Sequence, residues 1–166
     1  MSQYRLDELR KKIKLLQDAK RYEHTLGVMY TAASLAMCYG EDVEKALVAG
    51  LLHDVAKSFS TNLGHAPMGA KMAAEEFGVD DIYITDAICY HTTGRPNMTL
   101  LDKIIYVADY IEPNRDKAPN LANLRKLAFE DIDECLRTIL EDTLNYLKQQ
   151  GKEIDDMTEQ AYYYYK

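Results

Sequence analysis

The sequence of 166 residues has no tryptophan and only three phenylalanines, four prolines and eight glycines. It also lacks an apolar run approaching the roughly 18 residues that a membrane-spanning helix requires. The first 16 residues are dense in Arg, Lys, Asp and Glu, and do not resemble a secretory signal peptide. These absences predict a cytoplasmic protein that makes no contact with a membrane.

Cysteine is scarce as well. Cys38, Cys89 and Cys135 lie far apart in apolar helical contexts, and an odd number leaves one without a partner. This usage argues against a disulfide framework and favours reduced thiols in the core.

Basic residues are too few for a broad nucleic-acid surface. The chain has 20 Lys and Arg against 27 Asp and Glu, a net charge of -7. We therefore expect no DNA or RNA partner, although a small anion could bind where a few cations gather. A composition of 47% hydrophobic and 28% charged residues is that of a globular protein, and the length suits a single domain over residues 1–166. A homodimer is compatible with these totals.

Apolar residues recur at helical spacing, and the alternation typical of strands is lacking, so the fold class is all-α. Gly40 and Gly78 are predicted C-caps, Pro67 a first-turn residue and Thr99 an N-cap. Loops are expected over 58–65, 92–98 and 113–120, and a helical tail over 151–166 whose tyrosines 162–165 pack on a neighbouring surface. The predicted helices are Tyr4–Gln17, Arg21–Tyr39, Val43–Lys57, Pro67–Phe77, Asp81–His91, Leu100–Glu112, Leu121–Phe129 and Ile132–Gln150.

An adjacent imidazole and carboxylate, His53 and Asp54, follow a run of seven apolar or small residues at 46–52. The pair therefore lies at the end of a helix that must be buried. Burial of an unpaired carboxylate costs several kcal/mol unless a cation lies beside it. Successive helix residues differ by about 100°, so both side chains can converge on an ion beside the helix.

A second carboxylate, Asp109, stands inside an equally apolar helical segment at 104–111. It is either a metal ligand or half of a buried ion pair, and the available histidines favour the ligand. His24 lies midway through another helix that faces the core. Two imidazoles and two carboxylates suit a hard or borderline divalent cation, and the lack of a cysteine ligand argues against a closed structural zinc site.

In chain order, this set resembles the signature of the HD phosphohydrolase superfamily, namely His24, the doublet His53-Asp54, and Asp109. The resemblance extends from about Lys20 to Tyr146 and is greatest to the bacterial YqeK-type proteins. It implies an HD-type helical bundle and the symmetrical hydrolysis of diadenosine tetraphosphate to two ADP molecules. The segments that carry it are Lys20–Val28, Gly50–Lys57, His65–Ala70, His91–Arg95 and Ala108–Arg115.

The resemblance implies that a divalent metal is held by His24, His53, Asp54 and Asp109. The metal of the family is iron, while the donor set alone leaves manganese or another divalent ion open. Asp54 would also orient the attacking water, and Asp109 would face the substrate. His65 and His91 either complete a second metal position or donate hydrogen bonds to phosphate and the leaving group, and we favour the second role.

Several cationic and hydroxyl side chains are candidates for binding the phosphate chain. Lys57 follows the doublet by one helical turn, which places its ammonium on the same side as Asp54. Thr92, Thr93 and Arg95 belong to a short loop whose groups suit charge-assisted hydrogen bonds to phosphate. Arg21 and Arg115 either add positive charge to the cleft or lie on the surface.

The implied reaction is in-line attack of metal-activated water on a phosphorus, with Lys57, Arg95 and nearby histidines neutralising the growing charge. Two alternatives stay open. One is another HD nucleotide phosphohydrolase, which would release phosphate or triphosphate. The other is a nucleotide-sensing HD module without catalysis.

Overall fold

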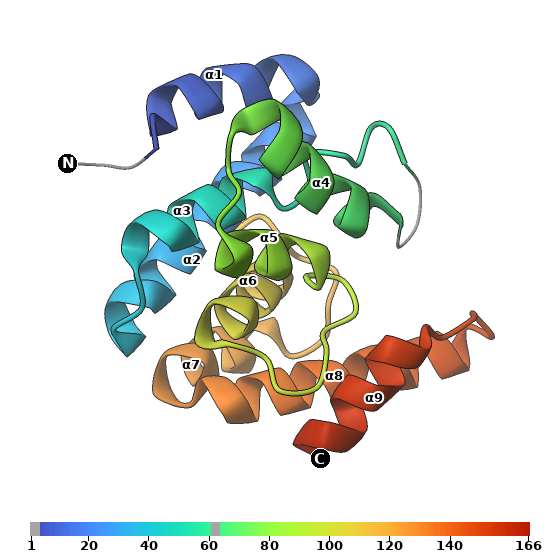
Figure 1. Ribbon diagram of the computed structural model, residues 1–166. Helices are drawn as coiled ribbons and strands as arrows, with labels where there is room; N and C mark the ends of the chain where they lie inside the picture. Colours follow the sequence, from blue (N-terminus) through green and yellow to red (C-terminus); the bar gives the residue numbers. More distant parts are fainter. Residues whose placement is uncertain (1–3, 61–63) are drawn as a thin grey trace.

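The computed structural model describes residues 4–60 and 64–166, and over these residues the chain forms helices and no strands (Figure 1). The all-α prediction is confirmed. The helices, in chain order, are α1 (Leu6–Leu16), α2 (Ala19–Tyr39), α3 (Val43–Leu52), α4 (His65–Phe77), α5 (Ile82–Cys89), α6 (Leu100–Ile111), α7 (Leu121–Glu130), α8 (Ile132–Gln149) and α9 (Asp156–Tyr165).

The helix ends that carry recognisable capping residues lie where the sequence predicts them. Gly40 and Gly78 end α2 and α4 with φ of 75° and 68°, a left-handed conformation that glycine adopts without a Cβ penalty. Thr99 starts α6 with a capping box, in which its hydroxyl accepts from the backbone of Asp102 and the Asp102 carboxylate accepts from the backbone of Thr99.

Two helices are shorter than predicted, at the ends that matter for the site. α3 ends at Leu52 rather than Lys57, because residues 53–59 wind more tightly through bonds from Val55 N–H to the Leu52 carbonyl and from Lys57 N–H to the Asp54 carbonyl. α5 ends at Cys89, two residues before His91. His53 and His91 therefore stand on turns that follow a helix.

Helix α4 begins earlier than predicted. His65 is its first residue, and Pro67 stays within the first turn, where a missing N–H costs nothing. Of the loop predicted over 58–65, residues 61–63 lie outside the described residues.

The core lies between α2, α3, α5 and α6, and its closest approach is at Gly50. A Cβ atom built on Gly50 would lie 2.8 Å from Cα of Met29, so the backbones of α3 and α2 are in direct contact there. Fully buried aliphatic side chains on α3 and α6 fill the remaining space, among them Leu51, Ile104 and Ile105. This packing fixes the relative positions of α2, α3 and α6, three of the helices that position the candidate site.

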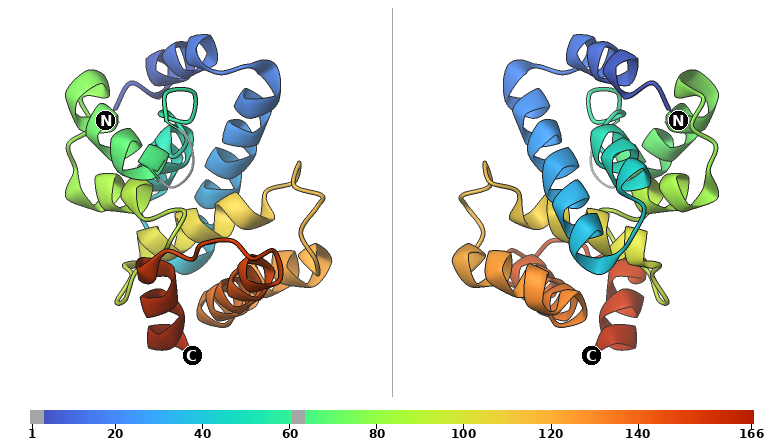
Figure 2. Two further views of the ribbon diagram at one scale, coloured as in Figure 1. Left: turned by 90° about the vertical axis from the view of Figure 1, so that its right-hand side faces the viewer. Right: turned by 90° about the vertical axis from the view of Figure 1, so that its left-hand side faces the viewer.

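A second group of helices, α7, α8 and α9, covers α6 on one side of the molecule (Figure 2). The tyrosine-rich α9 packs against α8, and the hydroxyl of Tyr165 accepts a hydrogen bond of 2.6 Å from the backbone N–H of Met98. The expected packing of the tail is therefore confirmed for Tyr165. Tyr163 and Tyr164, in contrast, are exposed.

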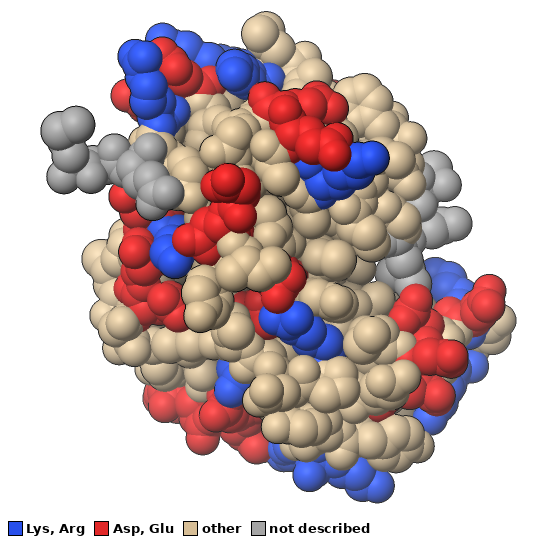
Figure 3. All heavy atoms as spheres, in the orientation of Figure 1, with Lys and Arg blue, Asp and Glu red and all other residues tan. Residues whose placement is uncertain are grey.

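Charged side chains of both signs alternate on the face drawn in Figure 3, where acidic groups lie beside basic ones. No described helix is long and apolar enough to cross a membrane. The three cysteines are free, and Cys135 is buried as expected, but Cys38 is exposed at the end of α2 and is not the core thiol that the sequence predicts.

Candidate metal centre

Histidines and aspartates from five separate segments meet at one point in the core. His24 comes from the second turn of α2, and Asp109 comes from the last turn of α6. His53 and Asp54 occupy the tight turn after α3. His65 starts α4, and His91 follows α5. The sequence-predicted ligands and the two further histidines are thus brought together.

The four predicted ligands form a first donor group. Nε2 of His24 lies 3.1 Å from Oδ1 of Asp109, 3.3 Å from Nε2 of His53 and 3.8 Å from Oδ2 of Asp54. Nε2 of His53 lies 3.6 Å from Oδ2 of Asp54 and 3.7 Å from Oδ1 of Asp109. The ligand atoms of His24, His53 and Asp109 all lie within 4.8 Å of one another, and Asp54 adds an oxygen beside both imidazoles.

These separations fit a metal ion. Ligands bonded at about 2.1 Å and arranged between right and tetrahedral angles lie about 3.0–3.4 Å apart. The observed distances start within this range and exceed it by a few tenths of an ångström. The donor chemistry fits as well, since mixed imidazole and carboxylate ligands suit a borderline divalent cation. The described residues can hold a divalent metal here.

A second donor group shares Asp54 with the first. Oδ1 of Asp54, the oxygen not used above, lies 3.1 Å from Nε2 of His65 and 3.4 Å from Nε2 of His91. The two imidazole nitrogens are 3.3 Å apart. Asp54 therefore has one oxygen in each group and bridges them.

Backbone carbonyls fix the tautomers of two of the histidines. Nδ1 of His53 donates to the carbonyl of Gly50, and Nδ1 of His91 donates to the carbonyl of Ile88, each at 2.7 Å. The proton on Nδ1 leaves a lone pair on Nε2, the nitrogen that faces Asp54 in both cases. Both imidazoles are oriented as ligands.

His65 has a different neighbour at Nδ1. The ammonium of Lys57, which can only donate, lies 3.4 Å from this nitrogen. The contact favours a proton on Nε2 of His65, which then faces Oδ1 of Asp54. Lys57 is thus linked to the cluster through His65, and its predicted role toward phosphate stays a prediction.

Both carboxylates stay ionised despite their burial. Burial alone would raise the pKa of the Asp54 carboxyl, but its electrostatic interaction with His53 and its contacts with His65 and His91 outweigh burial and lower that pKa strongly. For Asp109, burial is likewise outweighed by the hydrogen bond from His24, and the pKa is lowered. Anionic oxygens are therefore present at neutral pH.

The imidazoles respond to their surroundings in opposite directions. Complete burial lowers the pKa of His53 to about 4, and the attraction of Asp54 offsets this only in part. For His24, the contacts with Asp109 and Glu112 exceed the effect of burial and raise the pKa, and the Asp54 contact does the same for His91. His53 is thus neutral at pH 7, the state in which an imidazole binds a metal.

Two arginines lie against the carboxylates. Nη1 of Arg21 is 2.7 Å from Oδ2 of Asp54, and Nη2 of Arg115 is 3.1 Å from Oδ1 of Asp109. Of the two locations that the sequence leaves open for them, the structure places both at the site. Each guanidinium remains partly exposed and so borders solvent.

The loop after His91 makes contacts of its own. The guanidinium of Arg95 pairs with Asp102 at 2.7 Å and Asp86 at 2.9 Å, and stacks on Tyr90. Thr93 donates to the backbone of the neighbouring Gly94, while the buried Thr92 hydroxyl has no hydrogen-bond partner among the described residues. The contacts of Arg95 brace the loop, and the roles of these side chains toward phosphate stay predictions.

Sequence reasoning missed Glu112, whose Oε1 lies 3.0 Å from Nδ1 of His24. A glutamate just after a helix and before a proline has the pattern of a surface residue, yet Glu112 is buried. One signal was available, because Gly27 stands in the middle of a long helix where it has no conformational purpose.

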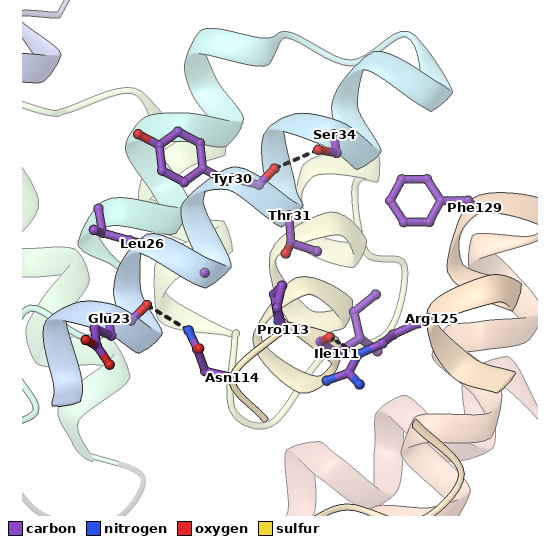
Figure 4. A pocket seen from close by; sticks show the side chains of 11 residues that line it. Glu23, Leu26, Tyr30, Thr31, Ser34, Ile111, Pro113, Asn114, Arg125 and Phe129 are labelled. Atoms are coloured by element: carbon purple, nitrogen blue, oxygen red, sulfur yellow. Dashed lines mark hydrogen bonds between the residues drawn. The ribbon is translucent and has the colours of Figure 1, made fainter. Parts of the chain in front are cut away.

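A groove of about 650 Å³ runs along the outer side of α2, between it and the segment that follows α6 (Figure 4). Glu23, Gly27 and Asn114 are among its lining residues, and the metal donors are not. The groove is therefore a feature distinct from the donor groups.

Comparisons with known proteins agree with the geometry. A family model described as HD domain matches residues 21–114. The symmetrical bis(5'-nucleosyl)-tetraphosphatase of Bacillus subtilis is 42% identical over 155 residues, which is 81% of this chain and 83% of that protein. The protein of the same name from Staphylococcus aureus is 33% identical over 169 residues, with 88% of this chain and 87% of the relative covered.

A solved structure is similar over nearly its whole length. It is a crystal structure from Clostridium acetobutylicum, described as a predicted HD superfamily hydrolase involved in NAD metabolism. The TM-score is 0.91 at 36% sequence identity, with 98% of this chain and 97% of the other covered. The helical arrangement described above is therefore shared with a known HD protein.

Proposed function

We propose that this chain, which belongs to the HD domain family together with the symmetrical bis(5'-nucleosyl)-tetraphosphatases, hydrolyses diadenosine tetraphosphate to two ADP molecules with the help of a divalent metal. The observation that carries the proposal is that His24, His53 and Asp109, from three segments, place their ligand atoms within 4.8 Å of one another, with an oxygen of Asp54 beside both imidazoles. The activity for which relatives that match over most of their length are named supplies the substrate.

Metal binding falls to His24, His53, Asp54 and Asp109, and we propose iron as the resident metal, with manganese as the second candidate. Bound in such a site, a divalent ion polarises a phosphoryl oxygen and makes water acidic enough to ionise near neutral pH. Asp54 is suited to orient the attacking water, because its second oxygen faces His65 and His91.

Cationic side chains at the edge of the donor groups are suited to the phosphate chain. Arg21 and Arg115 lie against Asp54 and Asp109 with part of each guanidinium open to solvent. Their unused N–H groups can donate to phosphate oxygens, and bidentate contacts of this kind are stronger than those between neutral groups. Lys57 adds a third positive charge beside His65.

The second donor group has two candidate roles. Since Lys57 favours a proton on Nε2 of His65, this histidine is suited to donate a hydrogen bond to a phosphate or leaving-group oxygen. The alternative, a second metal ion bridged by Asp54, is supported by the ligand-like tautomer of His91. We favour the first role, and metal content decides between them: one ion per chain supports it, and two contradict it.

Purified holoprotein incubated with diadenosine tetraphosphate tests the reaction, with products separated by anion-exchange chromatography and metal measured by elemental analysis of the same sample. We expect ADP as the sole product. ATP and AMP in equal amounts would mean asymmetric cleavage, and release of phosphate or triphosphate would favour another HD nucleotide phosphohydrolase. Tight binding without any product would identify a sensing module.

A matched pair of variants links the reaction to the site. Asp54→Asn should leave the circular dichroism spectrum unchanged and reduce turnover by several orders of magnitude, since the bridging carboxylate is lost. Asp7→Asn, on the exposed side of α1, should keep full turnover. Retained hydrolysis in the Asp54→Asn protein would refute the assignment.

A further inference from the structure

Glu112 is a buried carboxylate in contact with a proposed metal ligand, and the reaction proposed above assigns it no role. It follows the last residue of α6 and is 1% exposed. Its Oε1 accepts from Nδ1–H of His24 at 3.0 Å, and its Oε2 accepts from the backbone N–H of Asn114 at 2.7 Å. Each oxygen therefore has its own donor, and the carboxylate is held in one orientation.

The space that Glu112 occupies exists because residue 27 is glycine. A Cβ atom at position 27 would lie 2.2 Å from Oε2 of Glu112 and 3.0 Å from its carboxyl carbon. Gly27 lies in the interior of α2, where glycine costs about 1 kcal/mol relative to alanine. Helix α2 thus carries an unfavourable residue at a position where a methyl group would displace this carboxylate.

The segment that bears Glu112 is anchored to its surroundings on two sides. The guanidinium of Arg125, from α7, donates to the carbonyls of Ile111, Glu112 and Arg115. The side-chain amide of Asn114 donates to the carbonyl of Glu23 on α2, a contact visible at the edge of the groove in Figure 4. These contacts hold the end of α6 against α2, so that Glu112 stays aligned with His24.

His24 differs from His53 and His91 in the group that accepts the hydrogen bond from its Nδ1. The Nδ1 atoms of His53 and His91 donate to neutral backbone carbonyls three residues earlier in the chain. Nδ1 of His24 instead donates to an anionic side chain 88 residues away. An anionic acceptor fixes the tautomer more strongly and makes the opposite nitrogen a better electron donor.

We propose that Glu112 is a positioning residue that holds His24 with its Nε2 lone pair toward the metal centre, and that Gly27 is required to make room for it. The proposal rests on the proposed metal site but not on the identity of the nucleotide. Glu112 acts through His24 and touches neither the metal nor the substrate. Its effect should therefore appear in metal affinity before any turnover is measured.

The test is titration of metal-free protein with Mn²⁺, followed by electron paramagnetic resonance of the unbound ion. Relative to the wild type, Glu112→Ala should weaken Mn²⁺ binding about 10–100-fold, the usual cost of losing a partner that orients a ligand, and Glu112→Gln, which keeps an acceptor for His24 but loses the charge, should weaken it less. The melting temperature of the metal-free Glu112→Gln protein should fall less than that of Glu112→Ala, because the amide oxygen can still accept from His24. Failure of the wild type to bind Mn²⁺ would count against the proposed function. Equal Mn²⁺ affinity of the wild type and Glu112→Ala would overturn only the role of Glu112.

A double-mutant cycle tests the part played by Gly27. Gly27→Ala alone should weaken Mn²⁺ binding about as much as Glu112→Ala, because the new methyl group displaces the carboxylate. In the Glu112→Ala background the same change should have no further effect, since the remaining neighbour is a flexible amide nitrogen at 3.4 Å. Gly69→Ala, whose Cβ would make ordinary contacts, is the matched control and should bind Mn²⁺ like the wild type. Additive losses in the cycle would refute the proposed coupling.

The tautomer of His24 can be observed directly. In the ¹⁵N spectrum of the metal-free wild type, recorded at a pH above the raised pKa of His24 so that the ring is neutral, the imidazole of His24 should give the signals of a ring protonated at Nδ1. In Glu112→Ala these signals should shift toward a mixture of tautomers, while those of His53 and His91 stay unchanged. An unchanged His24 spectrum in this variant would show that the glutamate does not set the tautomer.

Discussion

The contact between α2 and α3 at Gly50 sets the distance between two proposed metal ligands, His24 and His53. The substitution Gly50→Ala, which adds one methyl group at this contact, tests this. A Cβ on Gly50 would lie 2.8 Å from Cα and 3.2 Å from N of Met29, which are both backbone atoms of α2. Backbone atoms cannot move aside as a flexible side chain does, so Gly50→Ala must push the two helices apart. Ordinary contacts begin at 3.4 Å, and the required displacement is therefore about 0.6 Å.

The displacement would strain the donor group. His24 is on α2 and His53 follows α3, and their Nε2 atoms are 3.3 Å apart. With bonds of about 2.1 Å, that separation gives an angle of about 105° at the metal, and an additional 0.6 Å opens it to about 135°. We expect a 10–100-fold loss of metal affinity, similar to the losses that follow disturbance of ligand orientation.

Gly50→Ala should also lower the stability of the metal-free protein. Overpacking costs about 1–3 kcal/mol, and the helix propensity of alanine returns about 1 kcal/mol of this. The net loss is up to about 2 kcal/mol, or up to about 8 °C in melting temperature for a chain of this length. Calorimetry of the metal-free protein and Mn²⁺ titration measure the two effects separately.

Gly69→Ala provides the matched control for Gly50→Ala. Its Cβ would lie 3.4 Å or more from Ile88, Val55 and the carbonyl of His53, so helix propensity alone should raise the melting temperature by about 2–4 °C. If Gly50→Ala is tolerated as well as Gly69→Ala, in both stability and Mn²⁺ affinity, then the contact of α2 with α3 does not set the spacing of the ligands.

Two further predictions concern features remote from the metal centre. Iodoacetamide should modify the exposed Cys38 first and Cys135 only on unfolding, because burial raises the pKa of the Cys135 thiol to about 12; mass spectrometry of the alkylated peptides gives the order. Lys45 contacts Asp81 at 2.8 Å, and this contact, opposing the effect of burial, lowers the pKa of the Asp81 carboxyl. Since a lowered carboxyl pKa stabilises the fold only while the group is ionised, Lys45→Met should cost stability at pH 7, and its urea midpoint should approach that of the wild type as the pH falls below about 4.

The residues proposed as ligands could be picked out from the sequence because each breaks a local pattern. Asp54 and Asp109 are carboxylates within apolar helical segments, where burial without a cation is costly, and both lie in the donor group. The same reasoning covers His24 and His53. Periodicity and capping residues likewise predicted most helices, since Gly40 and Thr99 act through contacts within a few residues.

Other features were not predictable from local pattern. The end of α3 was placed at Lys57 because residues 53–57 continue the apolar helical pattern, but in the structure they wind more tightly, and Nδ1 of His53 bonds the carbonyl of Gly50. Glu112 was missed because its partner is 88 residues away. Arg95 has the residue type of a phosphate ligand, and only the fold reveals that Asp102 and Asp86 already bind it.

Two glycines inside helices connect the sequence pattern with the packing around His24. Gly27 and Gly50 are both in helix interiors, where glycine is unfavourable and where neither residue has a positive φ. Each glycine is explained by a steric clash that a methyl group would cause. At Gly27 the clash would be with the carboxylate of Glu112, which contacts His24, and at Gly50 it would be with the backbone of α2, the helix that carries His24. At these two positions, unlike at Gly69, the glycine marks a close approach, and both approaches bear on where one imidazole lies. That is the reason to expect metal affinity to respond to two methyl groups, neither of which would touch the metal.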